Sequence, residues 1–178
     1  ASGSSAFGAG ALGSTTTGVN NAAFGADALG NNDSGNYNVA MGVEALYNNT
    51  SGSSNIAIGN GALHSNTTSE NNSALGRNAL YSNTTGRENS AFGSMALYTN
   101  IGGGYNTAFG YAALYSNRTG GNNTALGYEA GYSNSEGHLN VFLGNQAGYN
   151  ETGDNKLYIS NSSSTDLITG DFSTGAVS

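Results

Sequence analysis

Few side chains in this 178-residue chain could catalyse a reaction or hold a metal ion. Cysteine is absent, and the two histidines, His64 and His138, are far apart in the sequence. Thiolate metal sites are therefore excluded, and a histidine-based catalytic arrangement is not expected. Asp27 and Glu44 could form a carboxylate pair of the kind that glycosidases use, but two solvated surface acids explain them better. The glycines of Gly102–Gly104 lack the Lys and Ser or Thr of a phosphate-binding loop. We expect no enzymatic activity, no metal ion and no cofactor.

Aromatic residues recur at one fixed spacing and are the strongest candidates for contact with a ligand. Aromatic rings on a surface can stack on sugar rings, but they can also stack on one another and stiffen the protein. We favour mutual stacking and keep contact with a surface glycan as an alternative. The residues of this aromatic ladder are Tyr47, Tyr81, Tyr98, Tyr115, Tyr132 and Tyr149, with His64 between the first two.

N-glycosylation motifs recur at the same spacing. In a glycosylating host their asparagines could carry sugar. The same Asn and Thr residues suit a turn whose side chains hydrogen-bond the nearby backbone, and we favour that interpretation. The asparagines of these motifs are Asn32, Asn49, Asn66, Asn83 and Asn117.

All these spacings reflect one 17-residue repeat, which occurs nine times. Counted from its anchor asparagine, the repeat reads N-x-A-Φ-G-x-x-A-L-Y-S-N-T-T-G-x-x, where Φ is Phe, Leu, Ile or Met. A short period without drift is typical of a solenoid, in which each repeat is one coil stacked on the last. The anchors are Asn21, Asn38, Asn55, Asn72, Asn89, Asn106, Asn123 and Asn140, with Ser4 in the same phase.

Two glycine positions divide each repeat. Position 5 is Gly in all nine copies and position 15 is Gly in seven, which predicts corners that join two extended segments at about positions 1–5 and 7–11. A helix is disfavoured, because each glycine would cost about 1 kcal/mol. We therefore predict an all-β fold over residues 1–154, a parallel β-roll, or β-solenoid, of nine 17-residue coils. With about 4.8 Å between coils, the rod would be about 45 Å long.

The repeat has two apolar columns that predict how the rod packs. Alternation along a strand sends positions 3 and 4 to opposite faces, and we expect the bulky residues of position 4 to fill the interior. The alanines of position 3 would then form a long, flat apolar strip, which is rarely left exposed to water. This arrangement predicts a homotrimer whose candidate interface is Ala23, Ala40, Ala57, Ala74, Ala91, Ala108 and Ala125.

Charge composition limits the possible partners. The chain has a net charge of −7 and only four Lys and Arg residues, so it lacks the basic stripe that binds a nucleic-acid backbone. No apolar run approaches the roughly 18 residues that span a bilayer. We expect no nucleic-acid partner and no membrane insertion.

Residues 155–178 depart from the repeat. Lys156–Ser160 and Asp166–Phe172 look like two strands around a polar loop, and we expect them to form a β cap or assembly segment. Ala1–Gly3 instead continue the end of a repeat, and an uncapped coil offers unpaired backbone groups. Unlike ends predict head-to-tail filaments, because such contacts do not close. The candidate end-to-end contacts are Phe7, Leu12, Leu157, Ile159, Leu167, Ile168 and Phe172.

The repeat resembles the head repeats of trimeric autotransporter adhesins, in the strings N-S-A-F-G at Asn89–Gly93 and N-I-A-I-G at Asn55–Gly59. The resemblance covers residues 4–154 and implies left-handed β-rolls packed side by side in threes, although coils of that family are usually shorter. The longer string N-T-A-F-G-Y-A-A-L-Y-S-N-R-T-G at Asn106–Gly120 is similar to repeats of phage tail fibres and bacterial surface fibres. In many of these, a run like Asn155–Phe172 precedes an endosialidase-type intramolecular chaperone.

These observations predict a structural subunit of an extracellular fibre or filament, an adhesin-like stalk or head at a cell or virion surface. One alternative is a phage tail-fibre segment that binds a host-surface glycan. A second alternative is an ice-binding solenoid, which would need a flat and regular threonine array. The threonines shift between positions 13 and 14, which weakens this alternative: Thr16, Thr50, Thr67, Thr84, Thr119 and Thr152.

Overall fold

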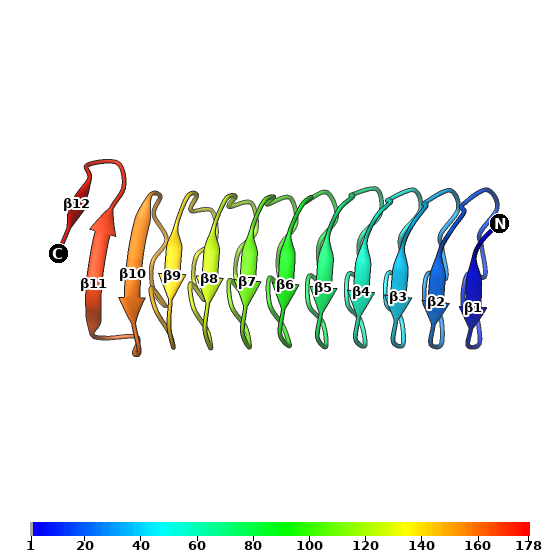
Figure 1. Ribbon diagram of the computed structural model, residues 1–178, viewed down its shortest axis with the longest axis horizontal. Coiled ribbons are helices and arrows are strands. Elements are labelled where there is room, and N and C mark those ends of the chain that lie inside the picture. The colour runs from blue at the N-terminus through cyan, green and yellow to red at the C-terminus, as the bar shows by residue number, and fades with distance from the viewer. Residues whose placement is uncertain (1) are drawn as a thin grey trace.

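The computed structural model describes residues 2–178, which form one sheet of 12 strands and no helix. The expectation for Ala1 therefore lies outside the described residues. Nine strands of three residues stack in chain order along a straight rod (Figure 1). They are β1 (Ser5–Phe7), β2 (Ala22–Phe24), β3 (Val39–Met41), β4 (Ile56–Ile58), β5 (Ser73–Leu75), β6 (Ser90–Phe92), β7 (Thr107–Phe109), β8 (Thr124–Leu126) and β9 (Val141–Leu143).

Each of these strands pairs in parallel with the next, in the register of the repeat. Ala23 lies opposite Ala40, and Phe24 lies opposite Met41, so every position of one coil stacks on the same position of the next coil. The prediction of a β-solenoid of about nine 17-residue coils is confirmed.

The last coil is one residue shorter than the others. β10 (Lys156–Ser160) pairs in parallel with β9, and Leu157 lies opposite Val141, where a full repeat would place Tyr158. β11 (Asp166–Asp171) and β12 (Ala176–Val177) then continue the same sheet in antiparallel fashion. The two strands predicted after residue 155 are therefore present, and β11 ends one residue before Phe172.

The second extended segment predicted in each coil, at positions 7–11, is absent from coils 1–9. Only positions 2–4 form a strand, and the chain turns sharply after it. In the second coil, Asp27 at position 7 and Leu29 at position 9 have left-handed backbone angles, with φ of 57° and 51°. The same positions repeat this conformation along the rod, which curls the chain back on itself within a few residues. Leucine seldom adopts this conformation, so the sequence pattern did not predict it.

The two glycine positions are needed for different reasons. Gly25, at position 5, has a φ of 139°, and a Cβ there would lie 2.5 Å from the carbonyl oxygen of Gly42. Gly35, at position 15, has an ordinary backbone, but its Cβ would lie 2.3 Å from the carbonyl oxygen of Gly52. Adjacent coils approach so closely at both corners that glycine is the common residue there, although Ser69 and Asp154 occupy position 15 in two coils.

The core lies inside the coils and is narrow. It consists of alanines at positions 3 and 8, leucines at position 9, and asparagines at positions 1 and 12. The alanines predicted to form an oligomer interface are at most 1% exposed within the single chain, so that prediction is wrong. The leucine and asparagine columns already fill the interior and leave only methyl-sized spaces at positions 3 and 8. The residues that were predicted at the interface and lie in the core instead are Ala23, Ala40, Ala57, Ala74, Ala91, Ala108 and Ala125.

Buried asparagines close each coil and join it to its neighbours. The side-chain amides of Asn21 and Asn32 both donate to the carbonyl oxygen of Gly35, at 2.8 and 3.1 Å, so positions 1, 12 and 15 meet inside the coil. The Oδ1 of Asn21 accepts the backbone N–H of Asn38 in the next coil, at 2.9 Å. Equivalent bonds recur along the rod, so these buried polar side chains are satisfied.

Candidate functional site

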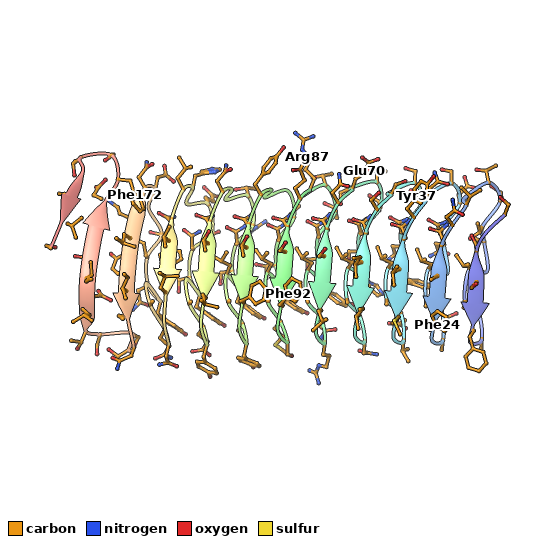
Figure 2. All side chains as sticks on the ribbon, in the orientation of Figure 1. Phe24, Tyr37, Glu70, Arg87, Phe92 and Phe172 are labelled. Atoms are coloured by element: carbon orange, nitrogen blue, oxygen red, sulfur yellow. The ribbon has the colours of Figure 1, made fainter. Side chains whose placement is uncertain are left out.

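The bulky side chains of position 4 point outward from the sheet, together with those of position 2. We call the surface that they form on β1–β9 the outer sheet face. Phe24, Leu75 and Leu126 on this face are 43%, 45% and 55% exposed. No charged residue occurs in these nine strands. Figure 2 shows Phe24 and Phe92 on this side of the rod.

The outer sheet face is continuous from the first strand to the C-terminal hairpin. The parallel register aligns the position 4 residues of all nine strands, and the rings of Phe92 and Phe109 stack with centroids 4.4 Å apart. Ile159 lies opposite Leu143, and Ile168 lies opposite Ile159, so the column extends into β10 and β11. The result is a straight apolar strip with the period of the coils.

The residues predicted to make end-to-end contacts are not gathered on one end surface. Phe7, Ile159 and Ile168 belong to the column of the outer sheet face, as their register shows. Leu12 is half-buried against the core at position 9, whereas Leu167 and Phe172 are exposed on and after β11. Leu157 is half-buried in β10, above Gly170 of β11. Head-to-tail association therefore stays a prediction.

The aromatic ladder has the predicted stacked geometry. Its rings run from Tyr47 through His64 to Tyr149, with adjacent centroids 4.8 to 5.6 Å apart and planes within 25° of parallel. Each ring is half-buried between its neighbours, so the column stiffens one side of the rod. A second stacked pair, Tyr111 and Tyr128 at position 6, was not predicted, although its 17-residue spacing is visible in the sequence.

The asparagines of the glycosylation motifs are fully buried. The side-chain amide of Asn49 donates to Asn32 Oδ1 at 2.7 Å and to the carbonyl oxygen of Gly52 at 2.9 Å. The favoured interpretation, that these residues serve the turn itself, is confirmed for Asn32, Asn49, Asn66, Asn83 and Asn117.

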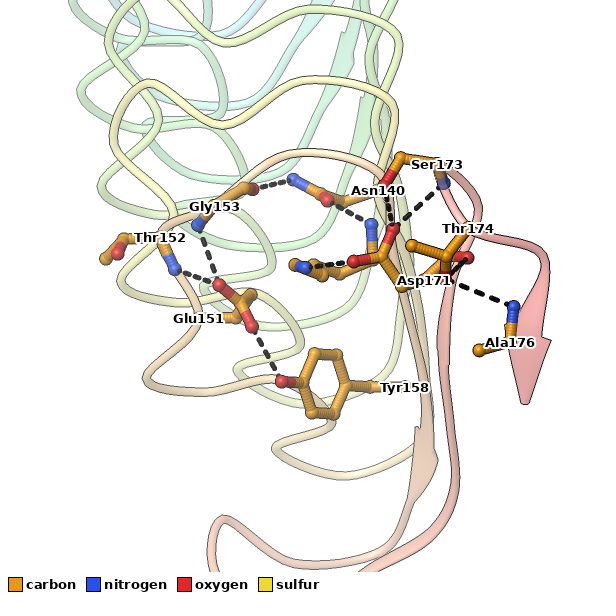
Figure 3. A network of polar contacts seen from close by, with 10 residues as sticks. Asn140, Glu151, Thr152, Gly153, Tyr158, Asp171, Ser173, Thr174 and Ala176 are labelled. Carbon is orange, nitrogen blue, oxygen red and sulfur yellow. Dashed lines mark hydrogen bonds and ion pairs between the residues drawn. The ribbon is translucent and has the colours of Figure 1, made fainter. Parts of the chain in front are cut away.

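A polar network fastens the C-terminal hairpin to the last coil (Figure 3). Glu151 takes position 12, where coils 2–8 have Asn, and accepts the N–H groups of Thr152 and Gly153 and the hydroxyl of Tyr158 at 2.6 Å. That hydroxyl bond, followed by burial, raises the pKa of Tyr158 to about 12. Burial pushes the pKa of Glu151 up, but its hydrogen bonds outweigh burial and lower the pKa overall.

A salt bridge links β10 to β11 in the same C-terminal region. Lys156 Nζ lies 2.7 Å from Asp171 Oδ2, and both side chains are about one-third exposed. The bond from Lys156, followed by the bonds from Ser173, holds the pKa of Asp171 well below its usual value. The network therefore stabilises the hairpin through groups that are ionised at neutral pH.

The residues with catalytic potential are dispersed. Asp27 is exposed, and Glu44 lies 3.8 Å from His64 Nε2, a loose surface contact. Within residues 2–178, His, Cys, Asp and Glu form no group of three that could hold a metal ion. The same residues contain no helix that could cross a membrane.

The threonine column gives no support to an ice-binding surface. Asp33, Ile101 and Arg118 interrupt position 13, and the hydroxyls of Thr50 and Thr84 donate to backbone carbonyls of the next coil at 3.1 and 3.2 Å. The hydroxyls are thus engaged within the rod.

Comparison of the chain with protein-family models, with curated proteins and with solved structures found no match.

Proposed function

We propose that this chain is a non-catalytic structural rod that packs side by side with two further copies of itself through the outer sheet face. The observation that carries the proposal is the continuous apolar column of position 4. Position 2 beside it carries only Ala, Val, Ile, Ser or Thr, so the face is uncharged over nine coils. An apolar strip that runs the length of the molecule is rarely left in water. Because the side chains of this face repeat once per coil, their spacing along the rod equals the spacing between coils.

A second copy of the chain is the partner that best fits this period. Because each coil repeats the last, a parallel copy contacts the face with the same spacing at every coil, whereas an unrelated globular surface does not. Each face is three residues wide, or about 10 Å. Three such faces around one axis enclose a shared core of ordinary side-chain thickness, and the charged corners stay in solvent.

A fibre role follows from this assembly together with the resemblance of the repeat to adhesin heads and surface fibres. A straight, rigid rod is suited to spacing or adhesion at a cell or virion surface. The protein would then act through its length and its surfaces, without chemistry.

The molecular mass in solution tests the proposal directly. Sedimentation equilibrium should give three times the chain mass of 17.8 kDa. The substitutions Ile58→Glu, Leu75→Glu and Phe92→Glu together should yield monomers, because an unpaired charge is costly to bury. A compact wild-type monomer at the highest soluble concentration would contradict the proposal.

The matched control places the same charges on exposed apolar residues outside the face. Val43 and Ile101 are 46% and 39% exposed, at positions 6 and 13. The substitutions Val43→Glu and Ile101→Glu should leave the mass unchanged. Circular dichroism of both variants separates loss of assembly from loss of folding.

A further inference from the structure

The backbone at position 16 shows a hydrogen-bond pattern that one segment of the rod breaks. At both ends of the rod, the N–H of this position donates to the side chain at the same position of the next coil. Val19 N–H donates to Asn36 Oδ1 at 2.8 Å, and Asn36 N–H donates to Ser53 Oγ at 3.0 Å. Toward the other end, Gly121 N–H donates to His138 Nδ1 at 2.9 Å. The column thus uses a side-chain acceptor from the following coil.

In two successive coils, position 16 is a glycine, Gly104 or Gly121, which has no side chain to act as this acceptor. Within the described part of the chain, the N–H groups of Arg87 and Gly104 have no protein acceptor. The N–H groups of Ser53 and Glu70 also lack one, but the next coil carries a long side chain at this position in both cases. A Cβ on Gly104 would lie 3.8 Å from Arg87 N, and a Cβ on Gly121 would lie 3.9 Å from Gly104 N. The missing side chains therefore leave open the space from which the two N–H groups are approached.

This space is an open trough of about 370 Å³ whose walls are polar and apolar in similar measure. Arg87 and His138 close its two ends along the rod, and Tyr105 and Asn122 line one side with exposed side chains. The hydroxyl residues Thr85 and Thr119 line the other side. Figure 2 shows Arg87 projecting from the upper edge of the rod, away from Phe92 on the outer sheet face.

The groups in the trough are mainly donors. Arg87 carries a guanidinium group that can bind a carboxylate through two parallel bonds. His138 accepts with Nδ1, so its neutral ring carries the proton on Nε2 as a further donor. The two free N–H groups are one coil apart, about 4.8 Å. A ligand that bonds both must present two acceptors at that separation.

We propose that this trough binds a carboxylated saccharide. The carboxylate would bond Arg87 and its N–H, and a ring hydroxyl oxygen would accept the N–H of Gly104. The ring would lie against Tyr105, whose side chain is 48% exposed, within reach of the threonine hydroxyls and the Asn122 amide. Glu70 and Glu88 lie beside Arg87 but do not line the trough. Their negative charge opposes every anion, so the donors of the trough must outweigh it for a carboxylate to bind. The trough and the outer sheet face lie on different sides, so the site does not depend on the proposed assembly.

Titration calorimetry with methyl β-D-glucuronide, methyl β-D-glucoside and inorganic sulfate tests the proposal on the intact protein. The glucuronide should bind at one site per chain, at least about tenfold more tightly than the glucoside, a difference that one charge-assisted bond can supply. Sulfate should bind more weakly than the glucuronide. Equal binding of sulfate or of the glucoside, or no binding of the glucuronide, would overturn the proposal.

Variants of the two glycines locate the site. The double substitution Gly104→Asn and Gly121→Asn supplies the acceptor that Asn36 provides elsewhere, and it should abolish glucuronide binding. Neither glycine has a left-handed φ, but a Cβ on Gly104 or Gly121 would lie 3.1 or 3.0 Å from a backbone carbonyl oxygen, so the neighbouring coil must shift slightly to admit asparagine. Ser53→Asn, at the same position of another coil, is the matched control and should bind normally. Arg87→Gln should lose most of the preference for the glucuronide. Unchanged binding by the double variant, with thermal unfolding like the wild type, would refute the assignment.

Discussion

At the scale of single residues, one large side chain in the core is accommodated by two glycines in place of leucines. Phe142 occupies position 3 of the ninth coil, where the coils before it have Ala, and it is fully buried. Gly131 and Gly148 occupy position 9, where other coils have Leu, and a Cβ on either would lie 2.5 or 2.3 Å from the Phe142 ring. One large ring thus replaces two leucine side chains. The three departures from the repeat are visible in the sequence, but their contact is not.

This compensation predicts a strongly non-additive pair of substitutions. Phe142→Ala should destabilise the C-terminal coils by about 3–5 kcal/mol, because it leaves a cavity. Gly131→Leu alone should also destabilise them, since the ring occupies the space. The double variant restores the common residues at positions 3 and 9 but leaves Gly148, so it should recover part of the loss. Urea unfolding of the four proteins measures the coupling, and additive losses would show that the residues do not share this space.

The titratable residues of the C-terminal network predict a pH dependence of the hairpin. The pKa of Asp171 is lowered, so its contribution is present above its usual pKa of 3.8 and is lost as the pH falls below it. The pKa of Tyr158 is raised from 10.0 to about 12, so its contribution is present below pH 10 and is lost as the pH rises toward 12. Ile168 methyl signals should therefore report opening of the hairpin at both extremes.

Two variants separate these limits. Asp171→Asn should loosen the hairpin at neutral pH and remove most of the acid transition, whereas Tyr158→Phe should reduce only the alkaline one. Glu136→Gln is the control, because Glu136 is exposed in the preceding coil and makes no contact with the network of Glu151 and Asp171. An acid transition of wild-type size in Asp171→Asn would contradict the role of the salt bridge.

At the scale of the coil, the sequence predicted the stacking but not which face lies inside. Alternation establishes only that positions 3 and 4 point to opposite sides. The interior volume decides between them, and it depends on the tight curl that the left-handed residues at positions 7 and 9 impose. Position 3 is uniformly small before Phe142, whereas position 4 varies among Phe, Met, Ile and Leu. A narrow interior requires the uniform column, so this contrast was the available signal.

The asparagine columns should be the main determinant of coil closure. Asn72→Ala removes the acceptor of the Asn89 N–H, 3.0 Å away, and the donor to the Gly86 carbonyl, 2.9 Å away. The Gly86 carbonyl keeps its bond from the Asn83 amide, so the main loss is the unpaired Asn89 N–H, which costs about 1–3 kcal/mol. Asn60→Ala, at exposed position 6, should change stability little. Thermal unfolding of the two variants checks the difference, and equal effects would argue against this role of the buried amides.

At the scale of the whole molecule, the strand pairs, side-chain hydrogen bonds and ring stacks of residues 2–178 join each coil to its neighbours. Every strand of the sheet pairs with its neighbours in chain order, and the ladders of Asn, Leu and Tyr repeat with the coils. Stability in such a rod is close to a sum of terms for single coils and for adjacent pairs. The number of coils can therefore change without a change of fold, provided that the register is kept.

Deletion of one whole coil tests this directly. Removing the complete repeat Asn38–Ser54 joins Tyr37 to Asn55 in the phase of the repeat, so Asn21 and Asn55 become neighbours in the position 1 column. The shortened protein should fold, with a rod shorter by about 4.8 Å. Removing only Asn38–Leu46 should disrupt the stack. The remaining residues of that coil would no longer lie opposite the same repeat positions of the neighbouring coils, and the glycines would lose their places at the close contacts. Small-angle scattering gives the length, and circular dichroism gives the retention of the fold. If both deletions were equally stable, the register of the repeat would not be what holds the coils together; if neither folded, the coils would depend on more than their neighbours.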